Sequence, residues 1–128
     1  MRIDLTNVFV DDTNKALEFY VNVLGFVKKV HIKEINWITV VSPEEPEGTQ
    51  LLLEPNYNPT ALTYQKAIFS QGIPATSFAV NNVEEEFERL TQLGVEFTMK
   101  PSKTVGAIIA VFNDTCGNLI QIHQTTDI

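Results

Sequence analysis

The sequence predicts an α+β fold built from two βαβββ modules, and three observations lead to this prediction. Two segments repeat one pattern: a short apolar strand, a pair of Asp or Asn residues, an amphipathic helix and a closing glycine. Further apolar stretches of strand-like composition follow each helix. An apolar connector joins the two halves. We therefore expect a single domain over residues 1–128, with a first module at 1–56, a connector at 57–73 and a second module at 74–128.

The first module begins with a strand-like run at residues 5–10, and a helix follows that ends near Gly25. Apolar residues recur at helical spacing over residues 16–24, so they share one helix face. Asp12 or Thr13 can cap the first amides of this helix, and Gly25 can adopt the left-handed conformation that ends it. The strands expected next are residues 26–31, 36–41 and 50–54.

The second module repeats this order. Its strand at residues 75–80 precedes a helix with a buried stripe of Val83, Phe87, Leu90 and, less tightly, Leu93. Glutamates fill the first turn, where the helix dipole favours negative charge, and a glycine closes the helix. The strands expected next are residues 95–99, 107–112 and 118–123, and a short helix is expected within the connector at residues 61–70.

Charge and cysteine content exclude several classes of partner. Asp and Glu outnumber Lys and Arg by 16 to 9, and the formal net charge is −7. An acidic surface repels phosphate backbones and anionic lipids, so neither nucleic acid nor a membrane is an expected partner. Cys116 is the one cysteine of the chain, which rules out an internal disulfide and favours a reducing compartment. Since the N-terminus has no long apolar run, we expect a cytoplasmic protein.

At this point the residues resemble a known family. The runs Val10-Asp11-Asp12, Ala16 to Tyr20 and Val23 to Phe26 are similar to the opening of the glyoxalase / bleomycin-resistance / dioxygenase superfamily, also called the vicinal oxygen chelate superfamily. The run Val111 to Ile122 is similar to its closing hairpin. The resemblance implies two modules whose sheets curl around a shared cavity, commonly completed in a homodimer.

The resemblance also places the metal ligands of the family. Metal-binding members hold one ligand on the first strand of each module and one on the last. The matching positions in this sequence are Leu5, Leu52 (Leu53 if the register slips by one), Ala75 and Gln121. Aliphatic side chains offer no donor to Zn, Ni, Mn or Fe, and a glutamine amide is a weak neutral ligand. We therefore expect the usual metal ligands to be lost and no cofactor to be bound.

A shifted metal site is an alternative that the sequence leaves open. His123 lies two residues after Gln121, and Glu54 lies two residues after Leu52, so each pair shares a strand face. Glu54 is also the candidate catalytic base. His31, among lysines, is expected at the surface.

The side chains beside the lost ligand positions indicate what a cavity would accept. Alternation along the strands predicts a mostly apolar lining with a few polar groups, which suits an uncharged or aromatic small molecule. The candidate ligand-binding residues are Leu5, Asn7, Phe9, Leu52, Ala75, Ser77, Gln121 and His123. Trp37 and Tyr57 can add stacking surfaces. The alternative is that these residues simply pack as core.

Three functions compete. The first is a metal-independent small-molecule binding protein, similar in architecture to the bleomycin-binding branch. The second is an enzyme of the lactoylglutathione-lyase type, a lyase or isomerase with a relocated metal or with Glu54 as base. The third is a protein whose main task is assembly with a partner chain. The sequence identifies neither the ligand nor a reaction.

Overall fold

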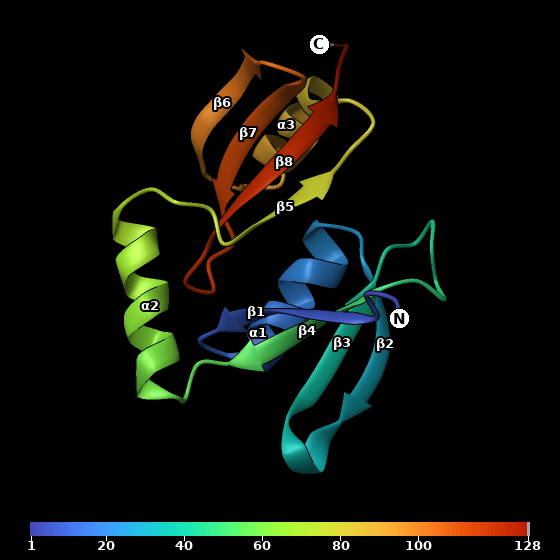
Figure 1. The fold of residues 1–128 in the computed structure, drawn as a ribbon, viewed down its shortest axis with the longest axis vertical. Coiled ribbons are helices and arrows are strands. Elements are labelled where there is room, and N and C mark those ends of the chain that lie inside the picture. Colours follow the sequence, from blue (N-terminus) through green and yellow to red (C-terminus); the bar gives the residue numbers. More distant parts are fainter. Residues whose placement is uncertain (128) are drawn as a thin grey trace. The chain divides into compact units, whose positions relative to one another are not determined.

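A computed structural model describes residues 1–127, which form two compact units, Met1–Tyr64 and a second unit that begins at Gln65 (Figure 1). Each unit contains one four-stranded mixed sheet and one helix between its first and second strands. The α+β class and the two βαβββ modules are therefore confirmed.

The sheet of the first unit has the strand order β1-β4-β3-β2. Its strands are β1 (Leu5–Val10), β2 (Val27–Ile32), β3 (Trp37–Val41) and β4 (Gln50–Pro55). The first and last strands, β1 and β4, pair in parallel, and the other pairs are antiparallel. A short 3-10 turn at Lys33–Ile35 connects β2 to β3.

Helix α1 (Thr13–Glu18) begins where Asp12 caps it, since the Asp12 carboxylate accepts hydrogen bonds from the backbone of Asn14 and Lys15. The expected regular helix up to Gly25 is corrected by the structure. After Glu18 the chain widens into a π-helical turn at Phe19–Val23. Gly25 then takes a φ of +90°, as predicted for a glycine that ends a helix.

One face of this sheet packs against α1. Its fully or nearly fully buried side chains alternate along the strands, as period-two geometry requires. They are joined by Ala16 and Tyr20 of the helix. The strand residues are Val8, Val10, Ile38, Val40, Leu51 and Leu53.

The sheet of the second unit has the corresponding order β5-β8-β7-β6. Its strands are β5 (Thr76–Ala79), β6 (Phe97–Thr104), β7 (Ala107–Asn113) and β8 (Leu119–Thr125). Here too the first and last strands, β5 and β8, pair in parallel. Strand β6 is longer than expected because it continues through Pro101, which lies at a register shift where the ladder is interrupted.

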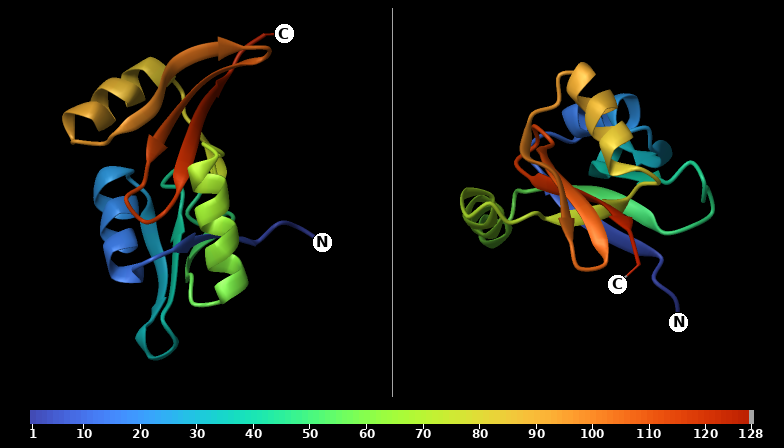
Figure 2. Two further views of the ribbon diagram at one scale, coloured as in Figure 1. Left: turned by 90° about the vertical axis from the view of Figure 1, so that its left-hand side faces the viewer. Right: turned by 90° about the horizontal axis from the view of Figure 1, so that it is seen from above.

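Helix α3 (Val83–Gln92) covers one face of this sheet (Figure 2). Asn82 caps it, and Val83 and Leu90 are buried as predicted. The ring centroids of Phe87 and Phe97 are 4.7 Å apart, and this edge-to-face contact links the helix to the sheet. Leu93 was expected in the stripe, but it is 54% exposed because the helix has already ended there.

The polar surface of α3 carries one clear electrostatic interaction. Arg89 donates to the carboxylate of Glu86, with a closest distance of 2.8 Å. This hydrogen bond, partly opposed by burial, raises the pKa of Arg89. Among residues 1–127, no helix combines the length and hydrophobicity that crossing a lipid bilayer requires.

The connector contains helix α2 (Pro59–Ser70), and the boundary between the two units falls within it. It begins two residues earlier than expected, because Asn58 accepts hydrogen bonds from the backbone of Thr60 and Ala61 and proline suits the first turn. The surprise in α2 is Gln65, a polar side chain that is only 3% exposed.

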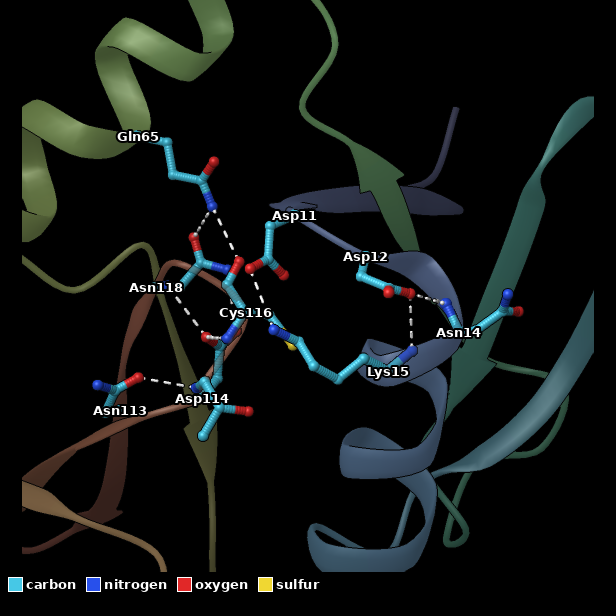
Figure 3. A network of polar contacts seen from close by, with 10 residues as sticks. Asp11, Asp12, Asn14, Lys15, Gln65, Asn113, Asp114, Cys116 and Asn118 are labelled. Carbon is cyan, nitrogen blue, oxygen red and sulfur yellow. Dashed lines mark hydrogen bonds and ion pairs between the residues drawn. The ribbon is translucent and has the colours of Figure 1, made fainter.

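Gln65 belongs to a buried polar network in the β7–β8 loop (Figure 3). Its Nε2 donates to the Cys116 carbonyl at 3.3 Å and to Asn118 Oδ1 at 3.2 Å. Asp114, fully buried, accepts from the backbone N–H groups of Cys116 and Asn118 and from Asn118 Nδ2. The loop between the last two strands, expected as a simple turn, is therefore a hydrogen-bonded structure with a buried thiol.

Candidate functional site

The register of β1 and β4 decides which side chains share a face in the first unit. Residues paired across parallel strands project to the same side of the sheet. Leu5 pairs with Gln50, Asn7 with Leu52, and Phe9 with Glu54. These six side chains lie opposite α1, on a surface that we call the Asn7 face.

The position that sequence reasoning left open in β4 is resolved by the same register. Leu53 pairs with Val8 and is completely buried in the helix-side core. Leu52 pairs with Asn7, and it therefore belongs to the Asn7 face. Leu5 is 44% exposed at the edge of this face.

Two polar pairs lie on the Asn7 face. Asn7 Nδ2 donates a hydrogen bond to Glu54 Oε1 at 3.0 Å, and Glu54 is half-buried. Thr39, which pairs with Leu52 from β3, donates through Oγ1 to Gln50 Oε1 at 2.7 Å and is completely buried. Sequence reasoning missed Thr39 and Gln50. Gln50 could have been predicted from the sequence, because it lies two residues before Leu52 and therefore shares the strand face of Leu52.

The second unit has an equivalent surface opposite α3, which we call the Ser77 face. In the parallel pair, Ser77 lies beside Gln121 and Ala79 beside His123. On the other side of β8, Val111 pairs with Gln121 and Ile109 with His123. Sequence reasoning missed the contribution of β7, although alternation along that strand supplied the signal.

Three polar side chains on the Ser77 face form a continuous hydrogen-bonded chain. Gln121 Nε2 donates to Ser77 Oγ at 2.9 Å. Ser77 Oγ in turn lies 2.7 Å from His123 Nδ1. Gln121 and His123 are both half-buried, so these hydrogen-bonded side chains are partly enclosed by the sheet and partly open to its surface.

The candidate residues thus fall into one group in each unit. Leu5, Asn7, Phe9, Leu52 and Glu54 form the first group, and Ser77, Gln121 and His123 form the second. Ala75 lies just before β5, tied by its N–H to the Leu119 carbonyl at 2.8 Å.

Of the other residues that the sequence singled out, Trp37 shares the Asn7 face, since it is half-buried on β3 two residues before Thr39. Tyr57 follows β4 and is 75% exposed. His31 is half-buried and pairs with the core residue Ile38, so it lies away from the Asn7 face.

The comparison with protein families decides the identity of this architecture. The model of the Glyoxalase/Bleomycin resistance protein/Dioxygenase superfamily matches residues 2–122. The chain belongs to this superfamily. The resemblance stated from the sequence is therefore confirmed.

Individual proteins also align with nearly the whole chain. The YurT protein of Bacillus subtilis (strain 168) is 54% identical over 126 residues, which cover 97% of this chain and 99% of that protein. The crystal structure of UcmS2 superposes with a TM-score of 0.81 at 30% identity and covers 98% of each chain. TnmS3, an antibiotic binding protein from Streptomyces sp. CB03234, superposes with a TM-score of 0.79 at 25% identity, over 98% of this chain and 97% of its own.

Metal binding, which the resemblance to this superfamily implies, can be tested against the donors on each face. Divalent transition metals require three or four imidazole, carboxylate or thiolate ligands. The Asn7 face offers Glu54, and the Ser77 face offers His123. Within residues 1–127, no three His, Cys, Asp or Glu side chains gather closely enough to hold a metal ion. The residues of either face do not fit such an ion.

Proposed function

We propose that this superfamily member is a small-molecule binding protein that holds a mostly apolar or aromatic ligand on its sheet faces without a metal ion. The observation that carries the proposal is the character of the two faces. Each combines apolar side chains with polar side chains that are already hydrogen-bonded to one another. Such surfaces can orient a ligand through a few polar contacts and bind it mainly by burying apolar area.

The Ser77 face illustrates this division of roles. Ala79, Ile109 and Val111 surround the polar chain with small or branched apolar groups. Met99, paired with Val111 and 40% exposed, adds a flexible apolar side chain that adapts to different shapes. An apolar molecule placed here would bury area worth about 25 cal/mol for each Å² removed from water.

The relatives support the same class of function. TnmS3 is an antibiotic binding protein, and its structure superposes on 98% of this chain. One fold can host several chemistries, so the likeness alone does not carry the proposal. Together with the apolar faces, it favours binding of a small organic molecule over other tasks.

Ligand-induced stabilisation tests the proposal directly. A library of uncharged and aromatic compounds should contain molecules that stabilise the protein, by about 2.7 kcal/mol at a hundred times Kd. Ala79→Arg, which places a long charged side chain on the Ser77 face, should abolish this effect. Leu93→Arg, at an exposed position after α3, is the matched control and should retain it. Absence of any stabilising compound would instead favour assembly with a partner chain.

Metal independence has its own measurement. Protein purified without a histidine tag should contain less than about a tenth of an equivalent of tightly held Ni, Zn, Mn or Fe. Metal at one equivalent would contradict this part of the proposal and favour a lyase or isomerase with a relocated site.

A second candidate function is metal-free catalysis with Glu54 as the base. It is favoured by the Asn7 contact, which fixes one carboxylate oxygen and so orients the other. A base must lie within hydrogen-bond reach of the proton that it removes. On a substrate that the protein turns over, Glu54→Gln should lower kcat by about 100-fold or more. Glu84→Gln, in the exposed first turn of α3, is the control, and equal turnover in both variants would exclude this role.

We also propose that the protein is a cytoplasmic homodimer. The superfamily resemblance and the exposed apolar side chains of α2, Tyr64 and Phe69, support the dimer. Sedimentation of a single 14.4 kDa species at micromolar concentration would contradict it. Cell fractionation tests the compartment.

A further inference from the structure

The three hydrogen-bonded side chains on the Ser77 face have a preferred donor order, which hydrogen counting and contact distances together indicate. A serine hydroxyl has one hydrogen to donate and two lone pairs that accept. Gln121 Nε2 supplies a hydrogen to Ser77 Oγ, so one lone pair is occupied. Within residues 1–127, the other hydrogen-bond partner of this hydroxyl is His123 Nδ1, which accepts the hydroxyl hydrogen when Nδ1 carries no proton.

The distance supports this direction. Ser77 Oγ and His123 Nδ1 are 2.7 Å apart, whereas the Gln121 contact measures 2.9 Å. Hydroxyl donors form shorter hydrogen bonds than N–H donors: typically 2.7–2.8 Å to an oxygen acceptor, against about 2.9–3.0 Å for an N–H. The shorter contact therefore matches an O–H that donates to the imidazole.

We infer that Gln121 and Ser77 fix His123 as the Nε2–H tautomer, and that this N–H binds a carbonyl oxygen of the ligand. In a neutral imidazole, a nitrogen that accepts leaves the proton on the other nitrogen. Nε2 lies across the ring from Ser77 and makes no hydrogen bond with the described residues. Ser77 and Gln121 are positioning residues, because they act through His123. This inference rests on the proposed small-molecule binding.

The apolar neighbours of His123 make its N–H selective for ligands that carry a hydrogen-bond acceptor. Ala79 and Ile109, its neighbours on β5 and β7, offer no hydrogen bond from their side chains. A ligand that covers His123 removes water from Nε2–H, and only an acceptor atom at that point replaces the lost hydrogen bond. An analogue without the oxygen leaves the donor unsatisfied and is rejected.

The tautomer can be measured in the protein without any ligand. The chain has two histidines, His31 and His123, so ¹⁵N-imidazole spectra are simple, and His31→Gln assigns them. In the neutral imidazole, observed in alkaline solution, His123 should show protonated Nε2 and unprotonated Nδ1. Ser77→Ala should mix the two tautomers while the backbone spectrum of the fold is kept. Protonated Nδ1, or a spectrum that Ser77→Ala leaves unchanged, would overturn the inference.

A pair of probes of nearly equal shape tests the selection. The compounds are 2-acetylnaphthalene, which has a carbonyl oxygen, and 2-ethylnaphthalene, which lacks it. The ketone should bind about tenfold more tightly and should shift the His123 Nε2 signal. His123→Phe, which retains a ring but not the N–H, should remove the preference, so that the two probes bind with nearly equal affinity.

The outcomes separate the two proposals. If both probes bind equally and the Nε2 signal does not move, the selection by His123 is wrong while small-molecule binding stands. If neither probe binds, the proposed binding of aromatic molecules fails, and the selection falls with it.

Discussion

The two units of the chain share one plan but differ in the polar groups that they place on it. In both, the first and last strands of the module pair in parallel, an Asp or Asn caps the helix, and a glycine with positive φ ends it. The repeated parts are those that backbone geometry and core packing require.

The exposed polar groups differ on the faces opposite the helices. The Asn7 face presents a carboxylate, Glu54, oriented by an amide. The Ser77 face presents an imidazole, His123, oriented by a hydroxyl and an amide. One unit therefore offers an acceptor and the other a donor, on scaffolds of equal design. A duplicated fold can thus keep its core while its two surfaces acquire different hydrogen-bonding roles.

The largest expected effect tests whether the two cores are equivalent. Leu53 pairs with Val8, and Ile122 pairs with Phe78, at matching points of the two parallel strand pairs. Both are almost fully buried, so Leu53→Ala and Ile122→Ala should each lower the free energy of unfolding by about 3 kcal/mol. Urea unfolding measures this. A difference above about 1 kcal/mol between the variants would show that the two cores are not equivalent.

An intermediate effect is expected where the second unit departs from the first. Gly117 has a φ of +102°, and a Cβ there would lie 2.6 Å from Gln65 Nε2. Gly117→Ala should cost about 2–3 kcal/mol, because it combines left-handed strain with loss of the Gln65 hydrogen bonds.

Gly94→Ala provides the control for this prediction, since its φ is +89° and its Cβ would meet nothing within 4 Å. It should cost only about 1 kcal/mol, from strain alone. Adding Gln65→Ala to Gly117→Ala should cost less than the sum of the single changes. Simple additivity in thermal unfolding would show that the amide and the glycine do not interact.

The smallest expected effect concerns the helix caps. Asp12→Ala and Asn82→Ala should each destabilise their unit by about 1 kcal/mol, because each removes the acceptor for the first helical N–H groups. The preceding exposed residues are the controls, and Asp11→Ala and Asn81→Ala should each change stability by less than about 0.5 kcal/mol. Circular dichroism during urea titration distinguishes the two pairs. Equal losses of stability at all four positions would indicate that charge or helix propensity, rather than capping, determines the change in the free energy of unfolding.

Periodicity predicted the elements because burial on one side is a local property of the sequence. Alternation also predicted that Glu54 shares a face with Leu52, and His123 with Gln121. It did not predict that Asn7 holds Glu54 or that Ser77 holds His123. Those contacts depend on the register between parallel strands, and the residues that they join are 44 to 47 positions apart in the sequence. No local pattern encodes this register.

Two further features were beyond local reasoning. The π-helical turn at Phe19–Val23 has no compositional sign, since the apolar spacing there equally suits a regular helix. Gln65 looks like a surface residue of an amphipathic helix. Its burial depends on a loop more than 50 residues away, whose carbonyl and amide groups need a donor.

The position of Gln65 in the middle of α2 has a practical consequence for anyone who wishes to split the gene. The boundary between the compact units lies directly before this residue, yet a break there would cut a twelve-residue helix and leave it to begin at a buried amide. A second half expressed from Asn58 would keep the capping residue, the entire helix and the hydrogen bonds from Gln65 to the β7–β8 loop in one polypeptide.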